Sequence, residues 1–135
     1  MEESMSDRKN VLFVCVHNAG RSQMAEAFFN HLTVTTSMAQ SAGTLPSDTV
    51  HQNVIDVMRE VGISLESARP KILTEYMIEQ ADKVFTMGCS VTDACPNVLV
   101  VSEDWGIEDP SGKPIETIRH IRDEIRDKVK KLLTL

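Results

Sequence analysis

Cys15 and Arg21 frame the segment of this sequence whose residue types and spacing are best suited to chemistry. Five residues separate them in Cys-Val-His-Asn-Ala-Gly-Arg-Ser, at 15–22. A loop of this length can turn its backbone N–H groups toward one oxyanion, and a following helix would add the positive end of its dipole. The guanidinium of Arg21 presents a planar fork that matches two oxygens of a tetrahedral anion. The segment therefore predicts an oxyanion-binding loop whose substrate contacts come from Val16, His17, Asn18, Ala19, Gly20, Arg21 and Ser22.

Cys15 is the residue of this loop that can act as a nucleophile. A cysteine is often simply a small buried hydrophobic residue, and that alternative applies to each of the three cysteines here. The position of Cys15 favours chemistry, because the loop N–H groups and the Ser22 hydroxyl would stabilise its thiolate. Asn18 and Gly20 are residue types that tolerate the left-handed backbone conformations that such a loop requires.

Cys89 and Cys95 lie in a segment that is rich in small and polar residues. A zinc site would need cysteines about two to four residues apart and two further ligands at similar spacing. The histidines show no such pairing; they are His17, His31, His51 and His120. Two buried structural thiols remain an alternative. Thiol–disulfide exchange requires only successive in-line attacks by thiolates, so we favour a flexible redox segment.

Apolar runs and helical periodicity predict the elements that position these residues. Strands are expected at 11–14, 38–42, 83–86 and 97–101. Helices are expected at 22–32, from an N-cap at Ser47 to a stop at Gly62, at 75–81 after Thr74, and at 115–133. The segment 102–114 contains Gly106, Pro110 and Gly112 and is predicted to be a loop.

Strands that alternate with helices indicate an α/β domain with a mainly parallel sheet. With the strand order 2-1-3-4, the chain reverses direction between the first and third strands, and ligands bind at the carboxyl ends of strands at such a reversal. Cys15 follows the first strand and Cys89 follows the third, so both thiols would lie beside one crevice. We expect a single domain at 10–135 after a flexible tail at 1–9.

Charge and composition argue against several classes of function. The sequence has 14 basic and 20 acidic residues, a net charge of -6 and no basic run, so we expect no binding to nucleic acid or anionic membranes. The first ten residues are polar, unlike a signal peptide, and no run of about 18 apolar residues predicts a transmembrane helix. We therefore expect a cytoplasmic protein, in which thiols stay reduced unless they are catalytic or redox-sensing.

Several motifs, in order, resemble those of a known family. Residues 15–26 are similar to the phosphate-binding loop of the low-molecular-weight protein tyrosine phosphatase fold and, within it, to the thioredoxin-coupled arsenate reductases. The resemblance continues through Ser-Ala-Gly at 41–43, Thr-Met-Gly-Cys at 86–89 and Glu-Asp-Trp-Gly-Ile-Glu-Asp-Pro at 103–110. It implies a phosphotyrosine protein phosphatase I-like fold, a single three-layer domain in which helices flank a four-stranded parallel sheet of order 2-1-3-4.

The resemblance also implies an activity, the reduction of arsenate to arsenite in arsenical detoxification. Cys15 would attack arsenic while Arg21 holds the oxyanion, and phosphate or sulfate would compete for the loop. Cys89 and Cys95 would then pass the oxidation, as successive disulfides, to thioredoxin as the external electron donor. No bound cofactor or metal is implied, and we expect the enzyme to act as a monomer.

Asp109 has two interpretations. An Asp-Pro pair followed by Ser-Gly is ordinary turn sequence, so its role is structural in the simpler one. The resemblance implies instead that Asp109 is the general acid that protonates the oxygen leaving the attacked centre. We favour catalysis, because the reaction would otherwise lack an acid at this end of the sheet.

Two other functions are compatible with the loop. A phosphatase would use the same loop and acid to cleave a phosphate ester through a phosphocysteine, but its aryl substrates would favour aromatic walls. Ser111 and Gly112 stand where the family's phosphatases carry tyrosines, and only 4% of the residues are aromatic. A non-enzymatic oxyanion-binding module would need neither Asp109 nor Cys95.

Two departures from the family pattern affect the predicted site. Ala19 and Gly20 replace a pair that usually includes a second cysteine, which leaves Cys89 as the obvious resolving thiol. Some family members bind potassium beside the loop, through residues that match Asn18, Glu26 and Ser41. Lys71 matches the fourth position, so we predict that its ammonium replaces the metal ion.

Overall fold

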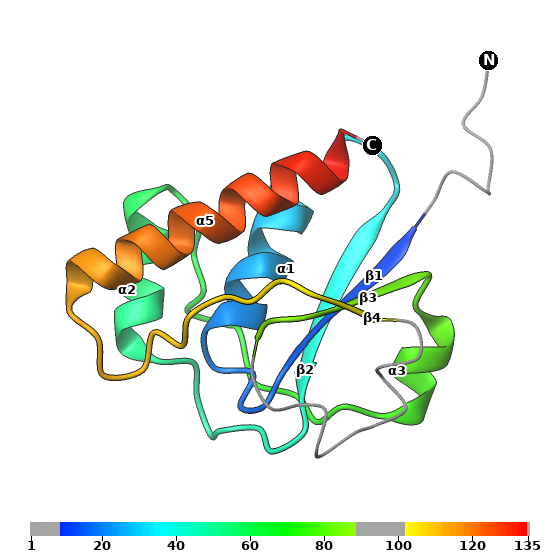
Figure 1. Cartoon of the computed structure of the whole chain (residues 1–135), viewed down its shortest axis with the longest axis horizontal. Helices are drawn as coiled ribbons and strands as arrows, with labels where there is room; N and C mark the ends of the chain where they lie inside the picture. The colour runs from blue at the N-terminus through cyan, green and yellow to red at the C-terminus, as the bar shows by residue number, and fades with distance from the viewer. Residues whose placement is uncertain (1–8, 89–101, 135) are drawn as a thin grey trace.

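A four-stranded parallel sheet lies at the centre of the protein (Figure 1). The computed structural model describes residues 9–88 and 102–134. Its elements are β1 (Asn10–Cys15), α1 (Arg21–Leu32), β2 (Met38–Gly43), α2 (Gln52–Glu60), α3 (Glu75–Gln80), β3 (Lys83–Thr86), β4 (Ser102–Asp104) and α5 (Ile115–Leu133). The strand order is β2-β1-β3-β4, and each neighbouring pair is parallel. The predicted α/β class and strand order are confirmed.

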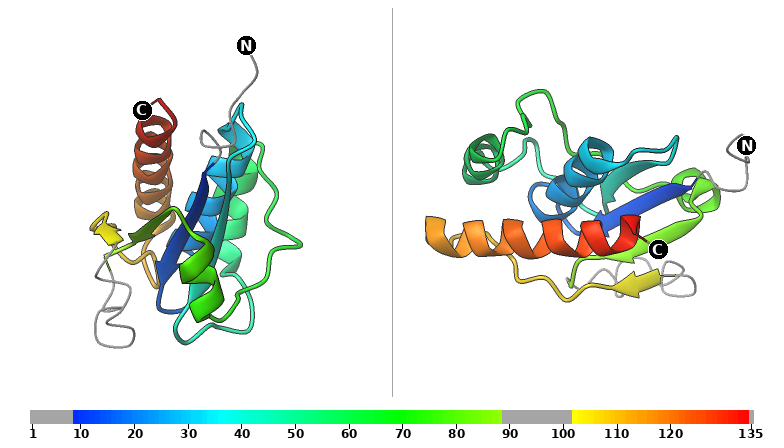
Figure 2. Two further views of the ribbon diagram at one scale, coloured as in Figure 1. Left: turned by 90° about the vertical axis from the view of Figure 1, so that its right-hand side faces the viewer. Right: turned by 90° about the horizontal axis from the view of Figure 1, so that it is seen from above.

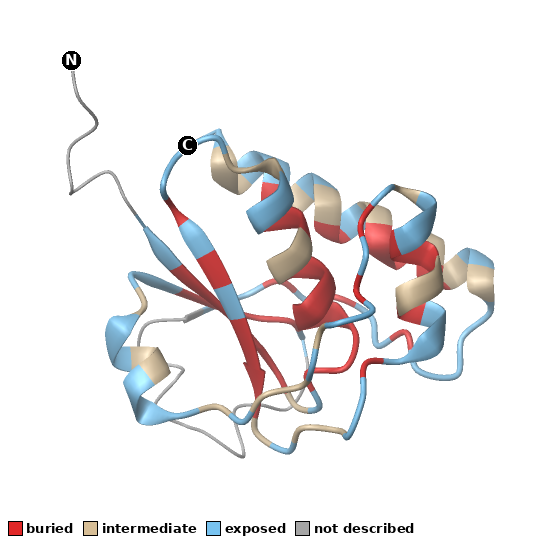
Figure 3. Cartoon of the chain, turned by 180° about the vertical axis from the view of Figure 1, so that it is seen from behind, coloured by how far each residue is buried: buried red, intermediate tan, exposed pale blue. Residues whose placement is uncertain are grey.

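The side chains of β1 point alternately into two cores, one on each face of the sheet. Phe13 and Cys15 belong to the larger core with α1, α2 and α5, whereas Leu12 and Val14 belong to the smaller core with α3. All four residues are at most 3% exposed. A strand buried on both faces carries a continuous apolar run, as the sequence does at 11–14. Helices therefore cover both faces, and buried residues concentrate in the strands and the inward faces of the helices (Figures 2 and 3).

The amphipathic pattern predicted for the last helix is confirmed in α5. Its Ile118, Ile121, Ile125 and Val129 are at most 3% exposed. α5 packs across α1 and α2, so its apolar stripe closes the larger core. Among the described residues, no helix is long and apolar enough to cross a membrane.

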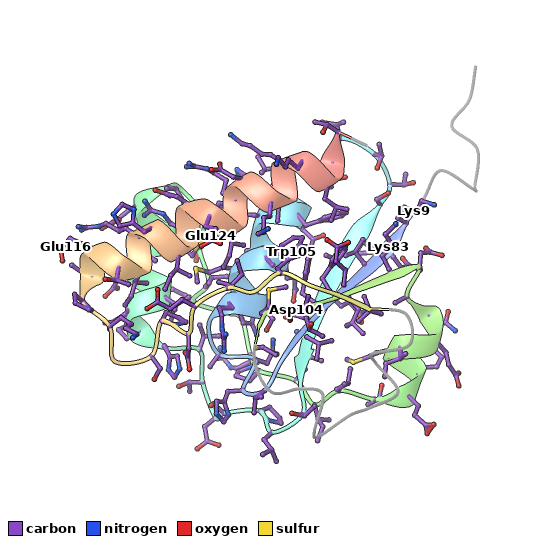
Figure 4. The ribbon with its side chains drawn as sticks, viewed as in Figure 1. Lys9, Lys83, Asp104, Trp105, Glu116 and Glu124 are labelled. Carbon is purple, nitrogen blue, oxygen red and sulfur yellow. The ribbon has the colours of Figure 1, made fainter. Side chains whose placement is uncertain are left out.

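Trp105, labelled in Figure 4, fixes the chain after β4 against the larger core. Its ring centroid lies 5.3 Å from that of Phe13 and 4.9 Å from that of Phe85. The ammonium of Lys128 on α5 lies 5.9 Å from the Trp105 ring. Aromatic and cation–π contacts at these separations are stabilising. The loop that carries Asp109 therefore begins from a fixed point.

Predicted signals at two helix ends are confirmed. Gly62, with φ 84°, follows α2, and its N–H bonds to the carbonyl of Arg59. The Thr74 hydroxyl accepts a hydrogen bond from the N–H of Met77 at 3.1 Å and so caps α3.

The predicted start of α2 was wrong. The helix begins at Gln52, after His51, whose side chain makes no capping bond. Ser47 lies in the preceding segment and donates its backbone N–H to the carbonyl of His17 at 3.0 Å. This tertiary contact overrides the local capping preference of a serine.

The predicted loop at 102–114 begins too early, because residues 102–104 form β4. They pair with residues 84–86 of β3. A short polar edge strand has no apolar run that would reveal it in the sequence. The strand predicted at 97–101 lies outside the described residues, as do residues 1–8 of the tail predicted at 1–9. Lys9, the last residue of that tail, donates its N–H to the Ser37 hydroxyl at 2.9 Å.

Glu60 at the end of α2 yields a pH-dependent prediction. Hydrogen bonds from Arg119, and then from Arg122, lower the pKa of Glu60 from 4.5 to about 2. A carboxyl whose pKa is depressed by folding stabilises the protein above its unfolded pKa and loses this contribution as pH falls. Glu60→Gln should therefore lower the Tm at pH 7, and the difference from wild type should disappear as pH falls from 4.5 to about 2.

Thermal unfolding followed by circular dichroism across this pH range measures the effect. The exposed Glu124 of α5 supplies the matched control, Glu124→Gln. A Glu60→Gln difference that stays constant through the acid range would contradict the assignment.

Candidate functional site

The carbonyl groups of residues 15–20 all accept hydrogen bonds from protein donors. The distances are 2.8–3.3 Å, and the donors are the backbone N–H groups of Thr44, Leu45, Ser47, His51 and Met24 and the side-chain amide of Gln23. The C=O and N–H of a trans peptide point in opposite directions, so tying the carbonyls down leaves loop N–H groups for an anion. The segment 44–51 therefore braces the predicted oxyanion loop.

Asn18 holds the loop in its unusual backbone conformation. Its φ is 51°, in the left-handed region, as the sequence predicted. Its side-chain oxygen accepts hydrogen bonds from the Lys71 N–H at 2.8 Å and from the Gln23 amide at 3.2 Å. The corresponding prediction for Gly20 was wrong, because its φ is -146°.

The thiol of Cys15 lies between two hydrogen-bonding groups. Its Sγ accepts the N–H of Asn18 at 3.2 Å and lies 2.9 Å from Oγ of Ser22. Ser22 Oγ in turn accepts from the amide of Asn18 at 2.7 Å, which leaves the hydroxyl proton of Ser22 for the sulfur. Two donors directed at one sulfur stabilise a thiolate, the nucleophilic form of cysteine.

Arg21 joins the oxyanion loop to the far side of the site. Its Nη1 donates to the carbonyl of Ile107 at 2.8 Å and to that of Met87 at 3.3 Å. Its Nη2 lies 4.0 Å from Oδ2 of Asp109. The Arg21 side chain is only 9% exposed, so it is held in place and keeps donors for an anion in the cavity.

The Asp109 carboxylate has the geometry of the predicted turn, and its catalytic role stays a prediction. Its Oδ1 accepts the N–H of Ser111 at 3.0 Å, which is ordinary turn geometry. Its other oxygen faces Arg21, and the side chain is 59% exposed. A turn of this kind also holds an accessible carboxyl beside the oxyanion loop.

Cys15, Arg21 and Asp109 line one cavity of about 280 Å³. The other lining residues are His17, Ala19, Gly20, Ser47, His51, Pro110 and Ser111, with no Phe, Tyr or Trp among them. Of the remaining predicted loop residues, Asn18 and Ser22 are buried behind the cavity and Val16 lines a neighbouring one. The neighbouring cavity, of about 660 Å³, also includes Arg21, Asp109 and Gly88.

Cys89 and Cys95 lie outside the described residues. Gly88, the last described residue before them, has φ 93°, and a side chain there would lie 2.8 Å from the backbone nitrogen of Ile107. This position therefore requires glycine.

Two polar residues that support the site were missed in the sequence analysis. Gln23, 2% exposed, bonds to Asn18 and to the Arg69 carbonyl. Asp104, labelled in Figure 4, accepts from the Thr86 hydroxyl at 2.6 Å and from the Gly88 N–H at 2.8 Å. Both lie inside motifs that carried the family resemblance, but nothing in residue type distinguishes them from solvated polar residues.

The residues predicted around a cation position are brought together. The ammonium of Lys71 lies 3.5 Å from Oε1 of Glu26, to which the Ser41 hydroxyl also donates. The backbone N–H of Lys71 binds the Asn18 side chain. A lysine thus neutralises Glu26 beside the loop. Within residues 9–88 and 102–134, no three His, Cys, Asp or Glu side chains are grouped to hold a metal ion.

The sequence and structure of this chain are similar to those of known proteins. Residues 10–135 match the low molecular weight phosphotyrosine protein phosphatase family. A Halobacterium salinarum protein with a provisional arsenate reductase name is 39% identical over 122 residues, which cover 87% of this chain and 85% of that protein. The structure of an arsenate reductase in its phosphate-binding state is 32% identical, with a TM-score of 0.83 over 93% of this chain and 97% of that chain. The YwlE arginine phosphatase from Geobacillus stearothermophilus is 26% identical, with a TM-score of 0.83 over 93% and 91%. The predicted fold family is confirmed.

The contact between Ser22 and Cys15 predicts the reactivity of the thiol. Ser22→Ala removes one hydrogen bond to a charged sulfur, so alkylation of Cys15 by iodoacetamide at pH 7 should slow roughly tenfold. The rate is measured by mass spectrometry in a Cys89→Ser/Cys95→Ser background, with the exposed Ser64→Ala as control. An unchanged rate would mean that the hydroxyl does not stabilise the thiolate.

The Lys71–Glu26 pair predicts the response to potassium. Lys71→Ala leaves Glu26 without its neighbouring cation, so its Tm should fall by a few degrees and recover partly in KCl compared with tetramethylammonium chloride at equal ionic strength. Wild type and the exposed Lys83→Ala control should respond alike to both salts. A selective potassium response of the wild type would show that Lys71 does not replace the ion.

Proposed function

This chain belongs to the low molecular weight phosphotyrosine protein phosphatase family, and we propose that it is an arsenate reductase with Cys15 as its nucleophile. The observation that carries the proposal is that Cys15, Arg21 and Asp109 line one cavity, with loop carbonyls turned to other partners. The arsenate reductase relatives support the choice of arsenate. Phosphate and sulfate would compete for the same loop.

The first step forms a bond between sulfur and arsenic. Arsenate binds the loop N–H groups and Arg21, and the Cys15 thiolate attacks arsenic. An As–O bond breaks, and Asp109 donates the proton that lets the oxygen leave as water. Arsenic is still pentavalent in this thiol adduct.

The second step transfers two electrons to arsenic. Cys89, as a thiolate, attacks the Cys15 sulfur, the S–S bond forms, and the electron pair of the S–As bond leaves with arsenic as arsenite. Cys95 next attacks Cys89 and releases the Cys15 thiolate, which leaves a Cys89–Cys95 disulfide. The dithiol of thioredoxin reduces this disulfide and is itself oxidised, so no bound cofactor takes part.

The proposal extends to the cellular compartment, the oligomeric state and the domain bounds of the enzyme. Its thiols must start reduced, so the proposed compartment is the cytoplasm. The proposed working unit is a monomer. The proposed domain is 10–135, the range of the family match.

The alternative is hydrolysis of a phosphate monoester through phosphocysteine. The likeness to an arginine phosphatase favours hydrolysis by the same loop, although the bond cleaved in phosphoarginine is P–N rather than P–O. The described cavity wall has no aromatic side chain to pack an aryl group, and hydrolysis gives Cys89 and Cys95 no role. We therefore place reduction first and expect weak phosphatase activity.

The fate of Cys95→Ser tests the proposal. With arsenate and thioredoxin present, the wild type should sustain NADPH oxidation by thioredoxin reductase over many turnovers. Cys95→Ser should release about one arsenite per chain and then stop, since the relay ends at Cys15–Cys89. Cys15→Ser should release none.

Hydrolysis of p-nitrophenyl phosphate by the same proteins supplies the comparison. The proposal expects slow hydrolysis that requires Cys15 and is indifferent to Cys95. No arsenate turnover in the wild type, together with brisk hydrolysis, would make the protein a phosphatase.

A further inference from the structure

Gly20 and Pro110 both line the cavity with little space between them, and we propose that this close packing positions the Asp109 carboxylate for proton transfer. The inference rests on the proposed role of Asp109 as general acid. Gly20 and Pro110 are positioning residues in this proposal, since they act through Asp109.

Space at Gly20 is limited by Pro110. A methyl group added at Gly20 would lie 3.3 Å from Cγ of Pro110 and 3.6 Å from Cγ2 of Val54. Val54 is 1% exposed in the larger core; Pro110 is also buried, but it lies on the loop after β4 rather than in a helix. Because the first distance is shorter than ordinary van der Waals contact, Pro110 is the neighbour that would shift, by a few tenths of an ångström.

A shift of Pro110 reaches Asp109 through the backbone. The proline ring fixes its own φ, and it restricts the residue before it to extended conformations. Little rotational freedom is therefore left at the Asp109–Pro110 junction to absorb the displacement. Asp109 Oδ1 also accepts the N–H of Ser111, so the carboxylate moves with this turn.

A second anchor lies on the other side of Asp109. The carbonyl of Ile107 accepts Nη1 of Arg21 at 2.8 Å. The acid therefore stands between Ile107, which is hydrogen-bonded to Arg21, and Pro110, which lies close to Gly20. Gly20 and Arg21 are consecutive residues of the oxyanion loop. This arrangement sets the carboxyl relative to a bound anion, and proton transfer depends steeply on that distance.

A double-mutant cycle tests the proposal through arsenate turnover. Gly20→Ala should lower kcat roughly three- to tenfold, since small displacements of a catalytic group are costly. The inhibition constant of inorganic phosphate should change by less than about threefold, since alanine keeps the backbone N–H. In an Asp109→Asn or a Pro110→Ala background, Gly20→Ala should change kcat by less than about twofold, because the acid or the crowding Cγ is gone.

An equal loss of kcat in all three backgrounds would overturn the proposal, because Gly20 would then act through the loop itself. If Gly20→Ala does not fold, Pro110→Ala alone must lower kcat with Asp109 present and not in the Asp109→Asn background.

A second assay distinguishes failure of the positioning role from failure of the proposed arsenate reductase activity. If the wild type reduces no arsenate, the cycle is measured on phenyl phosphate, whose leaving group needs a proton, beside p-nitrophenyl phosphate, whose leaving group does not. A Gly20→Ala loss confined to phenyl phosphate supports the positioning role, and an equal loss on both esters overturns it.

Discussion

Hydrogen bonds to the carbonyl groups of residues 15–20 are the constraint on which the rest of the site depends. A carbonyl turned toward the cavity would repel an oxyanion, so each one must find a donor elsewhere. Most donors are backbone N–H groups at 44–51, which follow β2, and this is possible because β2 lies beside β1 in the sheet. Gly43 makes the close approach possible, since a side chain there would lie 2.5 Å from the carbonyl oxygen of Val16. The sheet order thus serves the anion site directly.

A protein with net charge -6 repels anions at long range, so capture must depend on local groups. Arg21 is the described cation of the cavity wall, and its two carbonyl contacts fix it without neutralising it. Cys15 and Arg21 come from one loop, whereas Asp109 comes from the segment that follows β4. Their relative placement depends on the packing of Trp105 and on Asp104, the last residue of β4. The Asp104 carboxylate accepts hydrogen bonds from the Thr86 hydroxyl at the end of β3 and from the N–H of Gly106.

The family contains both phosphatases and arsenate reductases on one scaffold, which fits the chemistry of the first step. Attack by a cysteine on a tetrahedral anion is common to both activities, and fold alone does not decide between them. The two activities diverge after the first adduct: water attacks a phosphocysteine, whereas a second thiol attacks the sulfur. Under the proposed mechanism, the features of this chain that separate the two activities are the non-aromatic cavity wall and the two additional cysteines.

The local sequence by itself determined several helices and strands of this protein and the position of its oxyanion loop. The apolar run at 11–14 predicted β1, the periodicity at 115–133 predicted α5, and the Cys15–Arg21 spacing predicted the oxyanion loop, because these signals come from residues close in the chain. Tertiary structure decided the rest. Polar Ser102–Asp104 forms a strand only because β3 lies beside it. Ser47 bonds to the loop carbonyl of His17 instead of capping a helix, and Gln23 is a buried donor to Asn18. Each of these outcomes depends on a hydrogen-bond partner more than 4 residues away, such as β3, 18 residues before β4. Residue type and local spacing do not encode such a partner, so only the folded chain reveals it.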